Sequence, residues 1–318
     1  MKVYGADGLM LEHKLLVVYN ICELAKINID TYSHNIESIL RQNYTNYKVA
    51  VSGCKVSDST KIALQYQFMN KVSFCFIDDL FPVNITFNKT VKECIKKFGE
   101  FDGYIYIDSG IDFENQVNCL IEVNNRIDKS IGMLDFQASN DNGYPNWFKK
   151  AESDIFVQND FKIPIGRAIN LHVHFFDKSI YDFYENLIPD IFLAYCTESI
   201  FSFQCAALQK NWMIIKDIVL LHNKSVDGAT AGFNHSGKHG QYWNNLYGDL
   251  NIYDIINDPL AKQYGLGYEE MAGIMVHDPK VYDENGFALC DELKYYIKDK
   301  LFLPKSILDY NNIESIFK

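Results

Sequence analysis

The sequence predicts an α/β fold in which a mostly parallel sheet is flanked by helices. In the first 110 residues, short apolar runs alternate with segments of helical periodicity, which is the order of a doubly wound, Rossmann-type sheet. The apolar runs are continuous, as expected for strands that are covered on both faces. The expected strands are 15–20, 47–51, 72–77 and 103–107.

The helices between these strands are indicated by the residues at their starts. Ser33 and Ser57 carry short oxygen-bearing side chains, which accept hydrogen bonds from the free amide groups of a first helical turn. We therefore expect helices over 33–42 and 57–69, and a third helix over 87–97.

The rest of the chain is less regular. We expect helices near 115–125 and through 205–209, a strand near 129–136, and two separate strands at 212–215 and 220–222. From 251 to 318, segments with mixed apolar and charged faces predict a largely helical C-terminal extension. The expected organisation is one α/β domain over 1–250 followed by this extension over 251–318.

Composition limits the classes of partner. The 318 residues carry a net charge of −11 and a pI near 5.2, which argues against nucleic acid as a partner because phosphate backbones require a basic surface. No run approaches the roughly 20 apolar residues of a membrane span, and the N-terminus does not lead into a signal-peptide apolar region. We expect a cytoplasmic protein, with peripheral membrane contact and oligomeric state left open. Eight cysteines without a C-x-x-C pair predict reduced thiols.

One acidic stretch directly follows an expected strand. The strand 103–107 ends at Asp108-Ser109-Gly110-Ile111-Asp112, which places carboxylates at its carboxyl end. Ligands of open α/β sheets bind at that end, and two carboxylates suit a divalent ion chelated by nucleotide phosphates. The alternative is an ordinary Asx or glycine turn.

A second metal pattern lies further along the chain. His172 and His174 are two residues apart, so a strand would place both imidazoles on one face, a spacing that can bind zinc. The pair raises the alternative of a metal hydrolase, although no third ligand follows at a recognisable interval.

Residues 35–51 carry a resemblance to a known family. They read Asn-Ile-Glu-Ser-Ile-Leu-Arg-Gln-Asn-Tyr-Thr-Asn-Tyr-Lys-Val-Ala-Val and resemble the segment Ser-Ile-Leu-x-Gln-(Thr)-Tyr-x-Asn-Tyr-Glu-Val of family-two glycosyltransferases, which have the GT-A nucleotide-sugar fold. The resemblance covers roughly 12–223. It implies a nucleotide-binding half over about 12–115 and an acceptor half over about 116–250.

The same resemblance implies an activity. The chain would be a hexosyltransferase-like enzyme of glycan or polysaccharide biosynthesis. It would move a sugar from a nucleotide-diphosphate-sugar donor to an acceptor hydroxyl, with Mn²⁺ or Mg²⁺ and with inversion at the anomeric carbon. The alternative on the same fold is a non-catalytic nucleotide- or carbohydrate-binding protein.

The resemblance also implies residues at the nucleotide. In the family, the turn after the second strand reads Asp-Asp-Gly-Ser-Thr-Asp, whereas 52–58 here reads Ser-Gly-Cys-Lys-Val-Ser-Asp and lacks the acidic pair. We expect 52–55 to form the corresponding polar turn. The residues expected at the nucleotide are Tyr19, Asn20, Ser52, Asp58, Asp108, Ser109 and Lys238.

The metal ligands are implied in the same way. Asp108-Ser109-Gly110 takes the place of the family's Asp-x-Asp motif, and His222 resembles the histidine that completes the metal site in many of these enzymes. Because Gly110 replaces the second carboxylate, either Asp112 reaches the metal, or Asp108 acts alone, or the protein depends less on metal. We expect Asp108, Asp112 and His222 as ligands.

The acceptor side is implied by the stretch 187–203, which resembles the family's Glu-Asp acceptor helix. Glu198 lies at the expected helix start, where the helix dipole favours an anion. Ser199 occupies the place of the family's usual aspartate base, so Glu198 is the candidate base and Asp190 is the second candidate. Lys238, in a Gly-rich stretch, is expected to offset the charge of the leaving diphosphate, unless that stretch is a plain surface loop.

Overall fold

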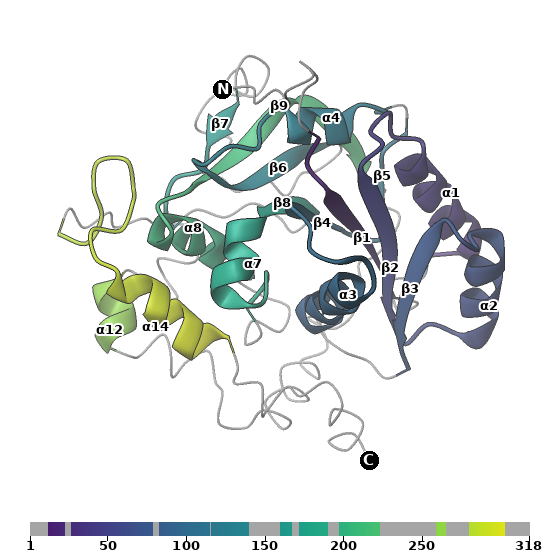
Figure 1. The fold of residues 1–318 in the computed structure, drawn as a ribbon, viewed down its shortest axis with the longest axis horizontal. Helices are drawn as coiled ribbons and strands as arrows, with labels where there is room; N and C mark the ends of the chain where they lie inside the picture. The colour runs from purple at the N-terminus through teal and green to yellow at the C-terminus, as the bar shows by residue number, and fades with distance from the viewer. Residues whose placement is uncertain are drawn as a thin grey trace.

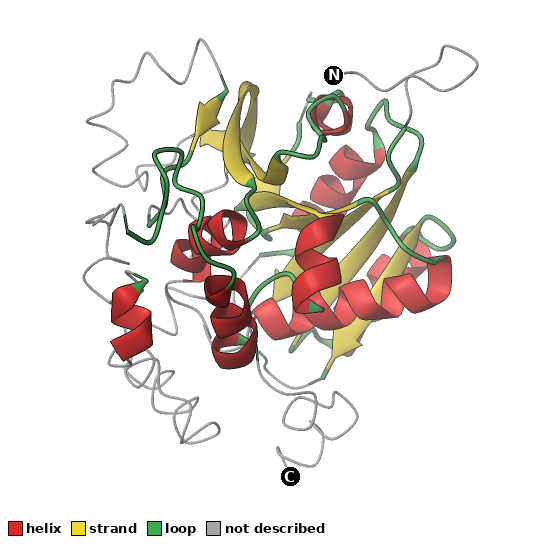
Figure 2. Ribbon diagram, turned by 60° about the vertical axis from the view of Figure 1, so that its left-hand side comes forward, coloured by secondary structure: helices red, strands yellow, loops and turns green. Residues whose placement is uncertain are grey.

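The structure is a computed structural model of the chain, and it shows an α/β fold, as the sequence predicts (Figure 1). It describes residues 12–22, 27–78, 83–114, 116–139, 160–166, 172–189, 197–222, 259–264 and 280–302. These residues form one nine-stranded sheet with helices on both of its faces (Figure 2).

The sheet is mixed, with most of its strands running in one direction. Its strands are β1 Leu15–Cys22, β2 Tyr47–Cys54, β3 Val72–Ile77, β4 Gly103–Ile107, β5 Ile111–Asp112, β6 Ile131–Ser139, β7 Phe161–Lys162, β8 Val173–Asp177 and β9 Asn211–His222. Their order is β3-β2-β1-β4-β8-β6-β9-β5, and β7 pairs with β9. The strands β1 to β4 are mutually parallel, β6 and β9 are parallel to each other, and β8, β5 and β7 run antiparallel to their neighbours.

Two apolar cores form because successive side chains of a strand point to opposite faces. The helices are α1 Ile29–Leu40, α2 Asp58–Gln67, α3 Val83–Phe98, α4 Cys119–Asn124, α7 Lys178–Tyr184, α8 Thr197–Ala207, α12 Pro259–Gln263 and α14 Glu292–Leu301. Leu16 and Val18 of β1 pack in the cluster that includes residues of α3, α7, α8 and α14. Leu15 and Val17 pack in the cluster that includes residues of α1, α2 and α4.

The helix starts differ from the sequence prediction at one position and agree at another. The helix α1 begins four residues before Ser33, because the Asn28 side chain accepts a hydrogen bond from the Thr31 amide (2.8 Å) and caps the helix there. Ser57 caps α2 as predicted, accepting from the Thr60 amide at 3.4 Å.

Two expected connections are strand in the structure. Residues 52–54, expected in a turn, continue β2, because they pair with β1 on one side and β3 on the other. The expected separate strands 212–215 and 220–222 are one strand, β9. A register shift against β6 between Ile215 and Val219 accommodates the extra residues without ending the ladder.

The described part of the C-terminal segment contains the helices α12 and α14, and α14 packs against α8. Its residues 280–291 form turns and an isolated bridge between Tyr282 and Ala288. Leu293 and Ile297 of α14 lie in the same core as Ile200 of α8. The rings of Tyr184 and Phe302 stack with centroids 4.9 Å apart, which joins α7 to the end of α14. Within the described ranges, no helix combines the length and apolar character that crossing a membrane requires.

Candidate functional site

The candidate site lies where the carboxyl ends of β2, β1 and β4 meet the amino end of the antiparallel strand β8. Asn20 of β1 pairs with Ser52 of β2. Asp108 follows the last residue of β4, and its amide donates to the carbonyl of His172, which immediately precedes β8 (2.8 Å). The first strand lies between β2 and β4, so this edge is a topological switch point, the usual ligand-binding place of open α/β sheets.

Asp108, His172 and His222 form a compact set of metal-ligating groups. One ligand atom from each lies within 4.8 Å of the other two, and the three residues are partly buried. The imidazole rings of His172 and His222 have centroids 4.3 Å apart. His222 ends β9 and is held against the sheet by pairing with Ile111 of β5. The set therefore offers a carboxylate oxygen and two imidazole nitrogens at one point.

The ligand types fit a divalent transition ion. Carboxylates suit Mg²⁺ and Mn²⁺, and imidazole suits first-row transition ions, so the mixed set favours Mn²⁺ over Mg²⁺. Ligand atoms on opposite sides of a Mg²⁺ ion lie about 4.2 Å apart. A separation of at most 4.8 Å among these three atoms therefore requires only small side-chain rotations to reach one ion.

Two of the three expected metal residues, Asp108 and His222, are in this set, and Asp112 is not. The Oδ2 atom of Asp112 lies 2.8 Å from His34 Nε2, and its Oδ1 atom accepts from the Glu114 amide (2.7 Å). Both contacts hold the carboxylate away from the cluster. They place it beside a separate cavity of about 310 Å³ lined by Asn28, Asp30, Thr31, His34, Asn35, Asp112 and Leu221.

His172 lies in this set, whereas His174, expected to share a zinc site with it, does not. His174 is fully buried, and its Nδ1 atom pairs with the Asp135 carboxylate, which also accepts from Trp212 Nε1 (2.6 Å). Burial raises the pKa of Asp135. Because His174 is engaged in the core, the two histidines do not form a joint zinc site, and the hydrolase alternative loses the pair on which it depended.

Tyr19 is hydrogen-bonded to the turn 108–110, which follows β4. Its hydroxyl donates to the Ser109 carbonyl (2.7 Å), and Asn35 Nδ2 donates to the Tyr19 hydroxyl (2.9 Å) and to the Ser109 carbonyl (3.2 Å). Tyr19 is fully buried, and desolvation raises the pKa of its hydroxyl. These contacts fix the turn that carries Asp108, so Tyr19 and the Ser109 backbone hold the site in place.

Asn20 and Ser52 leave buried polar atoms at the same edge. Asn20 Nδ2 donates to the carbonyls of Ile107 (3.1 Å) and Val18 (3.3 Å). Asn20 is 5% exposed and Ser52 is 1% exposed, yet neither Asn20 Oδ1 nor Ser52 Oγ has a hydrogen-bond partner among the described residues. Buried polar atoms are rarely left unsatisfied, so this pair points to a bound polar group.

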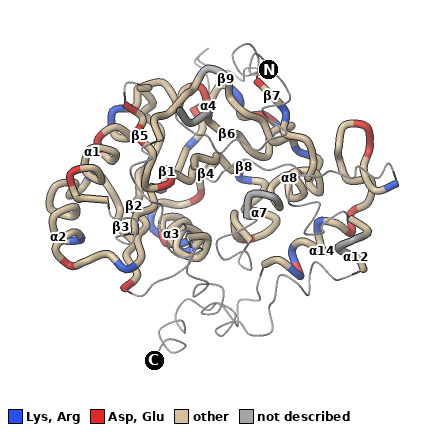
Figure 3. The backbone as a smooth tube through the Cα atoms, turned by 180° about the vertical axis from the view of Figure 1, so that it is seen from behind, with Lys and Arg blue, Asp and Glu red and all other residues tan. Residues whose placement is uncertain are grey.

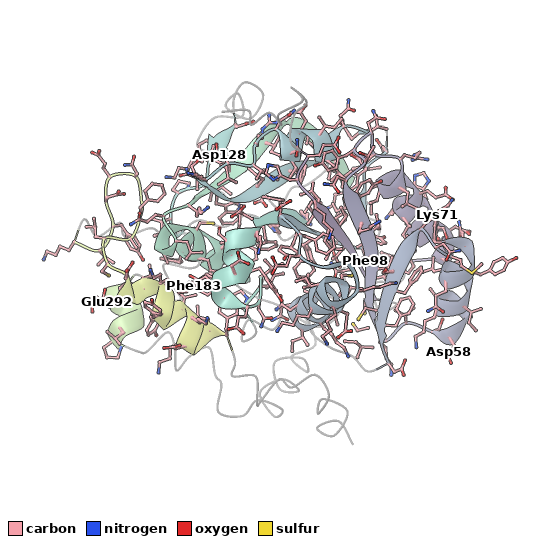
Figure 4. All side chains as sticks on the ribbon, viewed as in Figure 1. Asp58, Lys71, Phe98, Asp128, Phe183 and Glu292 are labelled. Atoms are coloured by element: carbon pink, nitrogen blue, oxygen red, sulfur yellow. The ribbon has the colours of Figure 1, made fainter. Side chains whose placement is uncertain are left out.

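The remaining expected residues are distributed differently. Asp58 lies on the first turn of α2 at the edge of the molecule, with its side chain 90% exposed and 3.3 Å from Lys61 (Figure 4). Glu198 is in the first turn of α8, as expected for a helix start. The Glu198 side chain, Asp190 and Lys238 lie outside the described part of the chain. Acidic and basic residues are interspersed along the described backbone (Figure 3).

The comparisons with known proteins rest on structure alone. No protein-family model matches the chain, and no curated protein sequence matches it. Its fold is similar to that of the mannosyltransferase PcManGT from Pyrobaculum calidifontis, solved with GDP-Man and Mn²⁺ (TM-score 0.52, 11% identity, 75% of this chain and 65% of that chain). It is also similar to S. aureus TarS 1–349 with UDP-GlcNAc (TM-score 0.53, 11% identity, 79% of this chain and 69% of that chain).

A further structure of S. aureus TarS has a TM-score of 0.51 at 12% identity, over 79% of this chain and 41% of the TarS chain. The chain thus spans under two thirds of the length of the mannosyltransferase chain and less than half of this TarS chain. Identities this low establish a common fold and nothing finer. The chain has the GT-A-like fold of these glycosyltransferases, which confirms the fold that the resemblance implied.

Proposed function

We propose that the protein is a glycosyltransferase that takes a sugar from a nucleotide-diphosphate-sugar donor and transfers it to an acceptor hydroxyl. The observation that carries the proposal is the set Asp108, His172 and His222 at the switch point of a GT-A-like sheet. The similarity to a mannosyltransferase solved with GDP-Man and Mn²⁺ and to TarS solved with UDP-GlcNAc supports it.

The donor would bind across the carboxyl ends of β2, β1 and β4. Asn20 Oδ1 and Ser52 Oγ would accept hydrogen bonds from polar groups of the nucleoside, so neither buried atom would lack a partner. Asp108, His172 and His222 would hold Mn²⁺, or Mg²⁺ in its place. When bound, the ion supplies positive charge that offsets the charge of the departing diphosphate.

The acceptor side of the proposal rests on the family resemblance. Glu198, in the first turn of α8, would remove the proton from the acceptor hydroxyl, with Asp190 as the second candidate. A base of this kind acts in an inverting transfer. We further propose that residues 1–250 are the catalytic domain and that 251–318 are a helical extension. The transferred sugar would be a hexose, and the enzyme would work in cytoplasmic glycan biosynthesis.

One observation favours a second candidate, a non-catalytic nucleotide- or carbohydrate-binding protein. The second strand carries Ser52 where the resemblance implies an acidic residue. The next acidic residue along the chain, Asp58, is exposed beside Lys61 on α2. Binding of a nucleotide sugar with neither transfer nor donor hydrolysis would favour this candidate over the enzyme.

The test is a thermal-shift series with UDP, GDP, UDP-GlcNAc and GDP-mannose, each with and without Mn²⁺. A ligand at about 100 times its Kd stabilises the folded state by about 2.7 kcal/mol, which raises the melting temperature measurably. We expect a selective, Mn²⁺-dependent shift that Asp108→Asn abolishes.

The matched control is Asp58→Asn, which removes a carboxylate that is exposed on α2. This variant should shift like the wild type. An equal Mn²⁺-dependent shift in the Asp108→Asn variant would refute the metal assignment. The absence of a shift with every nucleotide would count against nucleotide-sugar binding as a whole.

A further inference from the structure

Two cysteines end neighbouring strands at facing positions. Cys22 is the last residue of β1 and Cys54 is the last residue of β2, and the parallel ladder pairs them directly. Neighbouring strands lie about 4.8 Å apart, and disulfides join Cα atoms about 4.4–6.8 Å apart. Paired residues of a parallel ladder point to the same face of the sheet, so the Cα spacing and the shared face of the two cysteines suit a disulfide.

The pair lies directly beyond the buried polar atoms of the candidate site. Asn20 and Ser52 precede Cys22 and Cys54 by two residues on the same strands, and they form the pair two rungs earlier in the same ladder. All four side chains therefore share one face, with the two pairs about 7 Å apart along the strands. The thiols border the place where the proposed nucleoside would lie.

The two thiols also differ in access. Cys22 is half-buried, whereas Cys54 is 6% exposed. A small oxidant from solvent would thus meet Cys22 first and find Cys54 behind it. One accessible sulfur backed by a nearby resolving sulfur is the usual arrangement of redox-sensitive cysteines.

We propose that Cys22 and Cys54 are a redox modification site, at which a peroxide converts the two thiols into a disulfide that blocks the nucleotide edge of the sheet. The Cys22 thiolate attacks a peroxide oxygen and breaks the O–O bond, which gives a sulfenic acid and one water or alcohol. The Cys54 sulfur then attacks the sulfenic sulfur, and the S–S bond forms as water leaves. The two thiols lose two electrons, the peroxide gains them, and both thiol protons leave in these products.

A second thiol pair offers an internal comparison. Cys75 and Cys94 line one cavity of about 360 Å³ between β3 and α3. Burial raises the pKa of both thiols, for Cys94 to about 12, so little thiolate is present there near neutral pH. We expect the Cys22–Cys54 disulfide to form ahead of a Cys75–Cys94 disulfide.

The chemical test maps disulfides after brief treatment with hydrogen peroxide. Remaining thiols are alkylated, and the protein is digested with trypsin without reductant and analysed by mass spectrometry. Cleavage after Lys14, Lys26, Lys48 and Lys55 releases Cys22 in peptide 15–26 and Cys54 in peptide 49–55. We expect these two peptides to be joined in the wild type and in a Cys75→Ser control, and unjoined in Cys22→Ser. Oxidation of other cysteines with these two peptides still separate would overturn the proposal.

The second readout is nucleotide affinity, and this part rests on the proposed function. Peroxide should weaken binding of the nucleotide found by thermal shift at least tenfold in the wild type, reversibly with dithiothreitol, and should leave Cys22→Ser and Cys54→Ser unchanged. Equal affinity of the reduced and disulfide-linked protein would overturn the blocking role. Failure of the reduced protein to bind any nucleotide would refute the proposed function instead, while the peptide map still decides whether the disulfide forms.

Discussion

Replacing Asp135 with alanine should destabilise the fold strongly. Asp135 is fully buried in β6, pairs with His174 of β8 and accepts from Trp212 Nε1 of β9 at 2.6 Å. The alanine variant would leave both nitrogen groups buried without their carboxylate. Each buried group that loses its partner costs about 1–3 kcal/mol, so the two groups together cost about 2–6 kcal/mol, with about 3–5 kcal/mol as the middle of that range. We expect the free energy of unfolding to fall by about 3–5 kcal/mol.

The assay is denaturant unfolding followed by circular dichroism, with the free energy extrapolated linearly to zero denaturant. A loss of this size lowers the melting temperature by about 6–20 °C, at the value of about 2–4 °C per kcal/mol that holds for domains of about 150–250 residues. Asp135→Asn keeps one acceptor oxygen, so its free energy of unfolding should fall by less than that of the alanine variant. The control Asp58→Asn removes an exposed carboxylate and should not change stability measurably. An alanine variant within about 1 kcal/mol of the wild type would refute the reasoning.

Three further predictions test packing, thiol chemistry and catalysis. Gly103→Ala should lower the free energy of unfolding, measured with denaturant, by about 1–3 kcal/mol. The reason is that the added Cβ would lie 2.1 Å from Phe175 Cε2. An unchanged denaturation midpoint would contradict this prediction. The pKa of the Cys94 thiol is raised to about 12, so this thiol should react with Ellman's reagent at pH 8 only when the protein is unfolded. Fast reaction of Cys94 in the folded protein would contradict this prediction. Glu198→Gln should slow sugar transfer about 100-fold or more while sparing donor binding, and near-normal turnover would exclude this base.

The order of the strands in the sheet brings residues that are far apart in the sequence together at the candidate site. β8 is inserted antiparallel beside β4, which brings His172 to the level of Asp108. β9 runs the full length of β6 and delivers His222 to the same edge through its pairing with β5. A sheet in which β9 ended at the register shift would not carry a histidine to the cluster. The continuity of β9 is therefore a requirement of the candidate metal site.

The sequence by itself determined the architecture of the first half of the chain. Continuous apolar runs predicted β1, β3 and β4, and Ser57 predicted the start of α2, because both signals act between residues that are close along the chain. The place of Asp108 directly after a buried strand also followed from local pattern. The resemblance implied the GT-A-like fold, which the solved structures confirm.

Only the tertiary structure decided which polar groups meet. His172 joins Asp108 and His222, whereas His174, two residues away, is bound in the core by Asp135. Asp112, one of the expected ligands, is held instead by His34. These pairings depend on the order and register of strands far apart in the chain. Local periodicity carries no information about that order, because it reports which face of an element is buried and not which element lies beside it.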